Sequence, residues 1–373
     1  MPARQRDALH TRLPAFPWDT LADAHVAADN HPGGKIDLSI GTPVDEVAPG
    51  AQLALAEHAA HPGYPPTLGS FELREACVSW LLRAHGISGL EPDYIQPVVG
   101  TKEAVSSLPL MLGIGAGHTV VIPEIAYPTY EVGALVSGAR VIRADSLTQL
   151  GPMTPSLMFI NTPSNPTGAV LGVDHLRKVV SWAQQRGVIV VSDECYLGLG
   201  WDDNNPPVSI LDPRVNEGDL TGLLALHSLS KSHNFASYRF GFFAGDPSVI
   251  SELAEARKHL GLMVPGPVQA AAIAAMEDDI SADIQRLRYA RRRAVLLRAL
   301  SEAGFRVDHS EAGLYLWATR EENCRETISW LAKRGIIAAP GEFYGPRGAN
   351  HVRFSLTAAD HQIMDAADRI TAS

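Results

Sequence analysis

Cysteines and long apolar runs are both scarce in this sequence. Its three cysteines, Cys77, Cys195 and Cys324, lie far apart and form no CxxC pair. This argues against a disulfide framework or a structural metal site, and for a reducing compartment. No segment reaches the roughly 18 uninterrupted apolar residues of a membrane span, and no apolar core follows the arginines at the start. We therefore expect a cytoplasmic protein without a membrane anchor.

Positive charge is also in short supply. The chain has 31 Lys and Arg residues against 41 Asp and Glu residues, which gives a formal net charge of -10. Binding to the phosphates of a nucleic acid requires a basic face, so a nucleic-acid partner is not expected. A local basic pocket can still bind a small anion.

The length of 373 residues favours two domains.

Short apolar runs alternate along the chain with longer stretches of helical periodicity. Strands that are apolar on both faces and alternate with helices are typical of a mostly parallel sheet covered on both sides, an α/β fold. In such sheets, ligands bind beyond the carboxyl ends of the strands. The runs interpreted as strands are 94–100, 118–123, 157–163, 187–194 and 222–230, and helices are predicted at 101–112, 174–186 and 248–260.

The pattern changes near the C-terminus. Residues 280–303 predict one long, arginine-rich helix, and the stretches GFRVDHSEAGLYLWA and ANHVRFSL after it are shorter and more alternating. Alternation of apolar and polar residues is typical of strands with one buried face. We therefore expect a smaller α+β domain that begins near residue 275.

Only six residues are lysine, and Lys231 stands among hydroxyls in the stretch HSLSKSHNFASYRFGF. Ser228 and Ser230 precede it, and Arg239 follows eight residues later. A lysine amine can form an imine with an aldehyde, while hydroxyls and a guanidinium suit a phosphate. Lys102 is the main alternative as the imine-forming residue, because the other lysines lie in helical or loop patterns where a solvated position is the default.

Three further stretches place polar residues at the predicted carboxyl edge of the sheet. Asp193 ends the apolar run in GVIVVSDECY, and Tyr196 follows it closely. In GTKEAV a helix is predicted to begin at Thr101 directly after a strand, and the N–H groups of such a terminus bind anions. NTPSNPTGAV contains a tight turn at Asn165. Taken singly, each stretch has a simpler interpretation as a helix cap or a turn.

Together these residues fit one molecule, pyridoxal phosphate. Lys231 would form the imine, and Asp193 would pair with the protonated ring nitrogen, as this cofactor requires of its protein. Tyr127, in PEIAYPTY, would stack on the ring. The phosphate would be held by Thr101, Ser228, Ser230 and Arg239.

In these motifs, and in their order along nearly the whole chain, the sequence resembles the fold-type I, class I and II aminotransferases. The resemblance implies a large cofactor-binding domain at 45–275, a small domain at 276–373, and an N-terminal arm at 1–44 that contributes to the small domain. It also implies catalytic roles for Lys231, Asp193 and Tyr196. The other implied roles are phosphate binding by the backbone at Thr101 and Lys102, contacts of Tyr196 and Asn165 with the ring's 3-oxygen, and binding of the substrate carboxylate by Gly41, Asn165 and Arg353.

Tyr64, in GYPPTLGSFELR, matches a family tyrosine that reaches the phosphate of the neighbouring subunit. The resemblance therefore implies a homodimer with shared active sites. The partners expected otherwise are small amino-acid and keto-acid substrates.

Within the family, the likeness is to the actinobacterial N-succinyldiaminopimelate aminotransferases. VGTKEA, VIPEIAYPTYEV, DECYLGLGWDD and GPRGANHVRFSL carry it. It implies ping-pong transfer from L-glutamate to N-succinyl-2-amino-6-oxopimelate in lysine biosynthesis. Other aminotransferases and carbon–sulfur lyases of this fold share the same residues and stay open as alternatives. A regulator without turnover is a remoter alternative, because no basic helix-turn-helix is visible.

Overall fold

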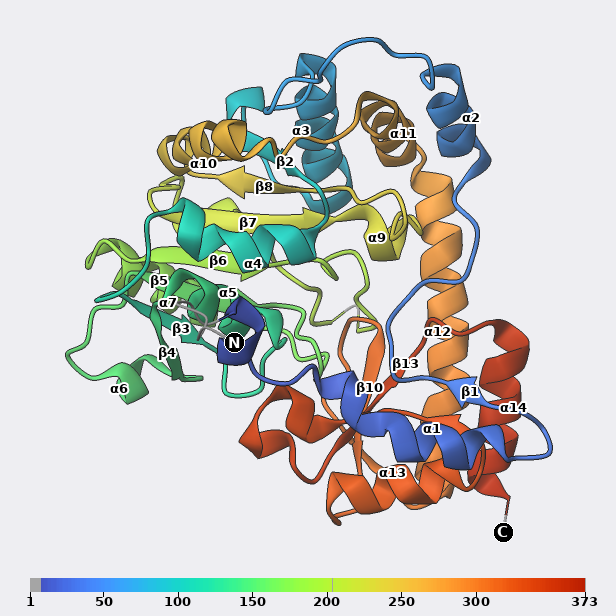
Figure 1. Ribbon diagram of the computed structural model, residues 1–373. Coiled ribbons are helices and arrows are strands. Elements are labelled where there is room, and N and C mark those ends of the chain that lie inside the picture. Colours follow the sequence, from blue (N-terminus) through green and yellow to red (C-terminus); the bar gives the residue numbers. More distant parts are fainter. Residues whose placement is uncertain (1–7, 203, 373) are drawn as a thin grey trace, which may run out of the picture.

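The computed structural model describes residues 8–202 and 204–372, with a seven-stranded sheet at its centre (Figure 1). The strand order is β2-β8-β7-β6-β5-β3-β4. Every neighbouring pair is parallel except those of β8, which is antiparallel to β2 and β7. The strands are β2 (Ile95–Val98), β3 (Thr119–Ile122), β4 (Arg140–Arg143), β5 (Leu157–Asn161), β6 (Ile189–Asp193), β7 (Leu223–Ser228) and β8 (Gly241–Gly245). The predicted α/β class with a mostly parallel sheet is confirmed.

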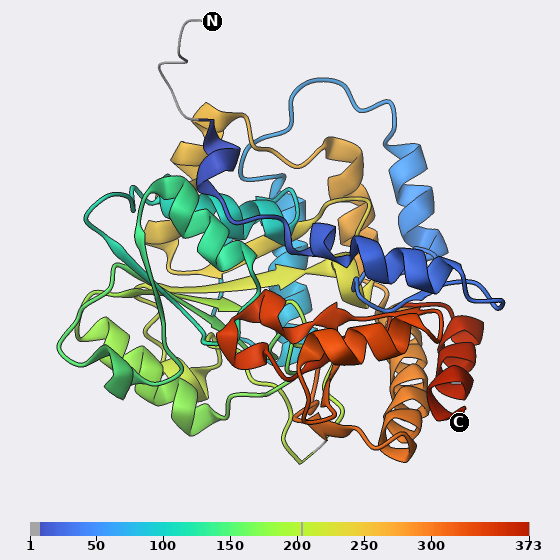
Figure 2. The ribbon, with the colours of Figure 1, turned by 60° about the horizontal axis from the view of Figure 1, so that its bottom comes forward.

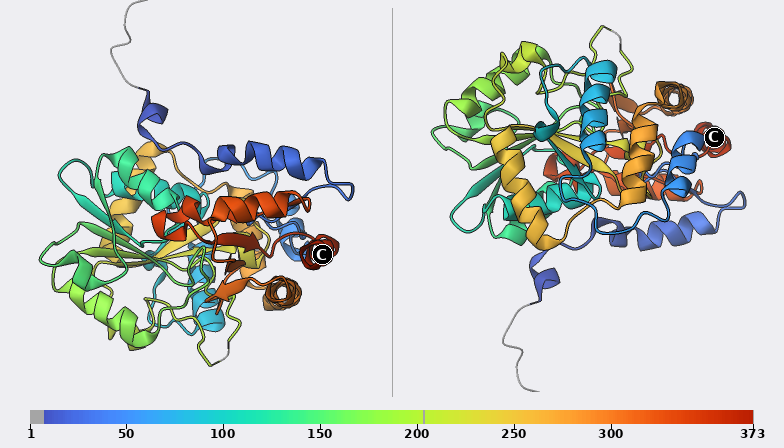
Figure 3. Two further views of the ribbon diagram at one scale, coloured as in Figure 1. Left: turned by 90° about the horizontal axis from the view of Figure 1, so that it is seen from below. Right: turned by 90° about the horizontal axis from the view of Figure 1, so that it is seen from above.

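Helices cover both faces of this sheet (Figure 3). Alternate residues of a strand point to opposite faces, so Leu223 and Ala225 of β7 belong to one buried cluster and Leu224 and Leu226 to another. The first cluster includes side chains of α3 (Phe71–His85), α7 (Val173–Gln184) and α11 (Gly266–Met276). The second includes side chains of α4 (Thr101–Met111), α5 (Thr129–Ser137) and α10 (Pro247–Leu260).

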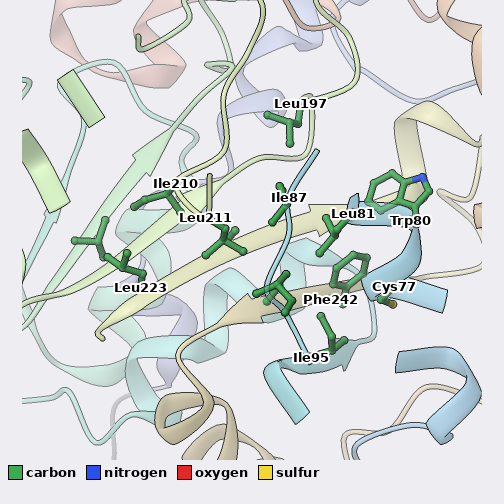
Figure 4. Packing of buried hydrophobic residues seen from close by; sticks show 14 of the residues in the cluster. Cys77, Trp80, Leu81, Ile87, Ile95, Leu197, Ile210, Leu211, Leu223 and Phe242 are labelled. Carbon is green, nitrogen blue, oxygen red and sulfur yellow. The ribbon is translucent and has the colours of Figure 1, made fainter. Parts of the chain in front are cut away.

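Helix α3 is fixed to the β2–β8 side of the sheet by large side chains. Figure 4 shows Trp80 and Leu81 of the helix close to Ile95 of β2 and Phe242 of β8, with Cys77 beside them. Cys77 is fully buried in this cluster. Burial of apolar surface on this scale is the main source of stability for the sheet and its helices.

The chain after α11 forms a second structural layer around a four-stranded antiparallel sheet of order β12-β13-β10-β9. Its strands are β9 (Arg306–Asp308), β10 (Tyr315–Thr319), β12 (Ala339–Pro340) and β13 (Val352–Ser355). The helices around it are α1 (Ala22–Asp29), α12 (Asp279–Glu302), α13 (Cys324–Ala332) and α14 (Asp360–Thr371). A further pair, β1 (Ile36–Asp37) and β11 (Ile336–Ile337), is parallel and joins the N-terminal segment to this layer.

The N-terminal segment runs along the molecule from the helices of the large sheet to α1 (Figure 2). Its described part begins with two short 3-10 helices, Leu9–Arg12 and Pro17–Leu21. The domain division at 44 and 275 stays a prediction, and residues 1–7 and 373 of its outer ranges lie outside the described part. Within the described residues, no helix has the length and apolar character needed to cross a bilayer.

The long predicted elements agree with the structure, and two strands of the large sheet are missing from the prediction. The expected helix at 280–303 is α12, and the five expected strands are β2, β3, β5, β6 and β7. Strand β4 was missed because its sequence, RVIR, is bounded by arginines at the exposed edge of the sheet. Strand β8 was missed because its two glycines and short length weaken the strand pattern. The remaining helices are α2 (Pro49–Glu57), α6 (Leu147–Leu150), α8 (Pro213–Asn216) and α9 (Leu229–Ser232).

Candidate active site

The carboxyl ends of β5, β6 and β7 lie side by side at one edge of the large sheet. The strand register pairs Asn161 with Asp193, and Asp193 with Leu226. Asn161 ties this edge together, because its Nδ2 donates to the Asp193 carbonyl at 2.8 Å and its Oδ1 accepts from the Asn165 N–H at 2.7 Å. The stretches that the sequence analysis assigned to this edge are therefore adjacent in space.

Lys231 lies on α9, the short helix that follows β7. Its Nζ is half-buried and donates to the backbone oxygen of Gly41, 190 residues away in sequence. Burial lowers the pKa of this amine, and the positive charges of Arg353 and Arg239 act in the same direction. A lowered pKa favours the uncharged amine, which is the form that reacts with carbonyl groups. Lys102, the alternative, has an exposed side chain.

Asp193 ends β6 with a buried carboxylate that accepts two hydrogen bonds. The hydroxyl of Tyr130 donates to Oδ2 at 2.7 Å, and the backbone N–H of Cys195 donates to Oδ1 at 3.2 Å. Burial raises the pKa of Asp193, and both hydrogen bonds oppose that rise because they stabilise the charged form. The sequence analysis missed Tyr130. Its position three residues after Tyr127, at the start of a helix, was the available signal.

Tyrosines surround the space between Asp193 and Lys231. Tyr127 is half-buried, its ring lies edge-on to Tyr130 at 5.8 Å, and burial raises its pKa to about 12. The hydroxyl of Tyr196 lies 3.2 Å from that of Tyr315, a residue of β10 that the sequence analysis also missed. Burial raises the pKa of Tyr196. Flat aromatic rings and buried hydroxyls suit a planar ligand with a polar rim.

Backbone N–H groups and serine hydroxyls at the starts of α4 and α9 form a second part of the site. Helix α4 begins at Thr101, directly after Gly100, so its first N–H groups lack partners within the helix. Ser228 caps α9, with its Oγ accepting from the Ser230 N–H at 3.1 Å, and both serines are buried. Unpaired N–H groups of helix starts and serine hydroxyls are suitable donors for a phosphate.

Arg239 completes this arrangement from an unusual backbone conformation. Its φ of 62° is in the left-handed region, its side chain is exposed, and its Nη1 donates to the Ala236 carbonyl at 2.8 Å. A methyl group on Gly100 would lie 2.1 Å from Arg239 Nη2. Because Gly100 has no side chain, the guanidinium of Arg239 can lie beside the start of α4. This donor set fits the phosphate of pyridoxal phosphate.

Arg353 lies in the buried centre of the site, on β13. Its Nη1 donates to Asn165 Oδ1 at 2.8 Å, its Nη2 donates to the Ser39 carbonyl at 2.5 Å, and its guanidinium lies 3.9 Å from the centre of the Tyr315 ring. Gly41 is packed against Tyr315, because a methyl group there would lie 2.2 Å from the tyrosine hydroxyl. A buried guanidinium with spare N–H groups is suited to a carboxylate.

Tyr64 is the one predicted site residue that the fold does not bring to this centre. It lies in the segment between α2 and α3, and 95% of its surface is exposed. Lys102 lies at the border of the site, with its Nζ 5.7 Å from the centre of the Phe16 ring. The other predicted residues, namely Gly41, Thr101, Tyr127, Asn165, Asp193, Tyr196, Ser228, Ser230, Lys231, Arg239 and Arg353, lie around the sheet edge or against one another.

Comparison with known sequences places the chain in one family. It matches the family aminotransferase class I and II over residues 33–370. It is 60% identical over 369 residues to a Mycobacterium tuberculosis protein named "probable aminotransferase", covering 99% of this chain and 88% of that protein. It is 50% identical over 359 residues to the 4-dedimethylamino-4-oxo-anhydrotetracycline transaminase of Streptomyces rimosus, covering 96% and 99%.

More distant relatives and solved structures agree in fold. An LL-diaminopimelate aminotransferase of Dehalococcoides mccartyi is 31% identical over 327 residues, covering 83% of this chain and 82% of that protein. The solved structure named "probable N-succinyldiaminopimelate aminotransferase" from Thermus thermophilus has a TM-score of 0.84 and 25% identity, covering 95% and 99%. The family match over most of the chain, together with this agreement in fold, identifies the chain as a class I and II aminotransferase, a member of a family that depends on pyridoxal phosphate.

Proposed function

We propose that this aminotransferase transfers the amino group of L-glutamate to N-succinyl-2-amino-6-oxopimelate, in the biosynthesis of lysine. The observation that carries the proposal is Arg353, a buried guanidinium with N–H groups to spare beside a lysine of lowered pKa. This pair suits substrates that carry a carboxylate next to the reacting carbon. The solved protein named for the succinylated substrate supports the choice of acceptor, since it matches the chain over 95% of its length.

The roles of the site residues form part of the proposal. When bound, pyridoxal phosphate supplies an aldehyde that attaches amino groups covalently and a ring that accepts electrons from Cα. Asp193 would hold a proton at the ring nitrogen, and the hydrogen bond from Tyr130 opposes the rise in the pKa of Asp193 that burial causes. Lys231 attaches the cofactor, and Tyr127 covers the ring. Tyr196 and Asn165 bind the ring's 3-oxygen.

Lys231 also acts as the base in this scheme. With the cofactor bound, the free amine of Lys231 would take up the proton from Cα of the substrate and hold it for the return step. The lowered pKa of Lys231 favours the uncharged amine, which is the form that accepts a proton. Arg353, Gly41 and Asn165 hold the substrate carboxylate, so that Cα stays within reach of Lys231.

The Streptomyces relative favours a second candidate function. Its printed name specifies a transaminase of a 4-oxo-anhydrotetracycline, and the identity of 50% extends over 96% of this chain. An acceptor of this kind carries its ketone on a polycyclic ring system. Such an acceptor would need an apolar, open site, whereas a succinylated amino acid would need further donors for its distal carboxylates.

The test is a two-step assay on the purified, cofactor-loaded protein. L-glutamate is first added, and loss of the visible absorption band of the cofactor's aldehyde form is recorded together with release of 2-oxoglutarate. The succinylated acceptor and the oxo-anhydrotetracycline are then supplied separately, and kcat/KM is compared. A higher kcat/KM for the oxo-anhydrotetracycline would replace the proposed acceptor. Persistence of the band with every amino donor would favour lyase chemistry.

The proposal includes a homodimer in which Tyr64 reaches the phosphate in the partner's site. Its exposure of 95% means that it has almost no contacts within its own subunit. Lys231→Ala and Tyr64→Ala proteins are each expected to lose activity, while hybrid dimers refolded from the mixture carry one intact site. Random pairing would restore about a quarter of the wild-type activity. Mixtures that stay as inactive as their components would refute the sharing of sites.

A further inference from the structure

Tyr344 is a buried residue next to Arg353 that none of the proposed roles uses. It ends the short 3-10 helix Gly341–Tyr344 and has no exposed surface. Its backbone oxygen accepts from the Ala126 N–H at 2.8 Å and from Arg143 Nη1 at 3.2 Å. These bonds attach Tyr344 to the segment that immediately precedes Tyr127, so the backbone fixes the tyrosine on the wall of the active site.

The ring of Tyr344 lies between Arg353 and Trp317. It lies 5.0 Å from the guanidinium carbon of Arg353 and packs edge-on against Trp317, with ring centres 5.9 Å apart. Burial raises the pKa of its hydroxyl; the charge of Arg353 opposes the rise, and Tyr315 and Tyr127 add to it. Besides burial, the groups that shift the pKa of the Tyr344 hydroxyl are therefore residues of the candidate active site. A raised pKa keeps the hydroxyl protonated and able to donate.

Two polar atoms at this place have no hydrogen-bond partner among the described residues. They are the hydroxyl of Tyr344 and the Nε of Arg353, each in a side chain that is at least nine-tenths buried. Buried tyrosine hydroxyls usually find a partner, because leaving one unsatisfied is unfavourable. Unsatisfied donors on two side chains that lie against each other point to one acceptor that satisfies both. A carboxylate, which can accept several hydrogen bonds on its two oxygens, is such an acceptor.

We propose that the Tyr344 hydroxyl donates a hydrogen bond to the substrate carboxylate that Arg353 binds, and that Tyr344 is thus a second substrate-binding residue that orients this carboxylate. The inference rests on the proposed role of Arg353. Two of the five N–H groups of Arg353 are engaged by Asn165 and Ser39, which limits the directions from which the guanidinium can reach a ligand. Tyr344 supplies a donor from a second side and so fixes the orientation of the carboxylate.

Tyr344→Phe tests the proposal, because it removes only the hydroxyl and keeps the ring that packs on Trp317. In the cofactor-loaded protein we expect the KM for L-glutamate to rise about 10-fold or more, the size of one hydrogen bond to a charged group. The Kd of 2-oxoglutarate, measured by calorimetry, rises by the same factor. The kcat changes less than about threefold, because the hydroxyl contributes equally to the bound substrate and to its transition state.

Stability separates this role from a structural one. Since the hydroxyl has no protein partner, its removal leaves the thermal unfolding midpoint of the substrate-free protein unchanged or slightly raised. Tyr94→Phe is the matched control, because Tyr94 precedes β2 at the opposite edge of the sheet. It is expected to change neither KM nor Kd.

Three results would overturn the inference. They are a Tyr344→Phe protein with the wild-type KM and Kd, a clear fall in its unfolding midpoint, and a KM that rises for L-glutamate but not for L-alanine. The last would assign the hydroxyl to a distal group of the substrate. Failure of the wild-type protein to use the succinylated acceptor leaves this test intact, because it relies on the amino donor alone.

Discussion

Gly100→Ala is the sharpest test of the phosphate site, because this glycine combines two constraints. Its φ of 81° and ψ of 149° lie in a region that is almost exclusive to glycine. A methyl group there would also lie 2.1 Å from Arg239 Nη2 and 2.6 Å from its guanidinium carbon. The substitution therefore strains the backbone before α4 and displaces the guanidinium at the same time.

The two effects have different magnitudes and different observables. A side chain in this backbone region costs roughly 1–3 kcal/mol, which lowers the free energy of unfolding. The overlap itself is relieved by movement of Arg239, since its guanidinium is the end of a flexible side chain. Loss of one hydrogen bond between charged groups is about 1.5–3 kcal/mol, so the Kd of pyridoxal phosphate should rise at least about 10-fold.

The assay is a titration of the cofactor-free protein with pyridoxal phosphate, followed by its visible absorption, together with urea unfolding. Gly113→Ala is the matched control, because Gly113 also has a left-handed φ, of 64°, but has no atom within 4 Å of the added methyl group. It should lower stability and leave the Kd unchanged. Combined with Arg239→Ala, Gly100→Ala should add little further loss of affinity, because both act through one side chain. Equal Kd values for Gly100→Ala and wild type would refute the reasoning.

Three further changes have defined outcomes. Tyr130→Phe removes the 2.7 Å hydrogen bond to Asp193 and should lower kcat about 10- to 150-fold. The acidic limb of the pH–rate profile should move to higher pH, because the bond stabilises the charged form of Asp193. An unshifted limb would contradict the pairing of Tyr130 with Asp193. Burial raises the pKa of Glu194 to about 7 from 4.5, and its carboxylate lies 3.7 Å from His227. The folded protein therefore holds the Glu194 proton more tightly than the unfolded chain does. The stability that this proton provides is complete below about pH 4.5 and is lost as the pH rises through 7. The unfolding free energy of wild type should thus fall relative to Glu194→Gln over this range, by up to roughly 3 kcal/mol, and parallel unfolding curves would exclude this titration. Lys231→Ala should abolish turnover yet bind the cofactor noncovalently, and measurable turnover would remove Lys231 from its role.

The site residues that the residue pattern itself predicted are those that follow strands directly, whereas Gly41, Tyr64 and Arg353 came from the family resemblance. In a parallel sheet the carboxyl ends of neighbouring strands meet at one edge, so Asp193 and Lys231 could be placed together without knowledge of the tertiary structure. The backbone anion site at Thr101 follows from the same reasoning, since a helix begins there directly after a strand. Proximity in these cases is a consequence of local sequence and sheet topology.

The contacts that the sequence did not reveal join residues distant along the chain. Tyr130 meets Asp193 across 63 positions, and Tyr196 meets Tyr315 across 119. Neither pair follows from periodicity, because each depends on how the helices pack on the sheet or on how the small sheet lies against the large one. The unpartnered hydroxyl of Tyr344 was invisible for the same reason, as burial and a missing partner are properties of the folded chain.

The charges around Arg353 support its proposed role in binding a substrate carboxylate. Arg353 is buried, and within the described residues it forms no ion pair with an aspartate or glutamate, since its two hydrogen bonds go to an amide oxygen and a backbone oxygen. A buried charge without a counter-charge is unfavourable. The same excess of positive charge acts on Tyr315: although burial acts to raise its pKa, the charges of Arg353 and Lys231 lower it overall. In the proposed role, a substrate carboxylate would supply the missing negative charge, and much of its binding free energy would come from relieving this imbalance, which a neutral ligand of the same shape could not do.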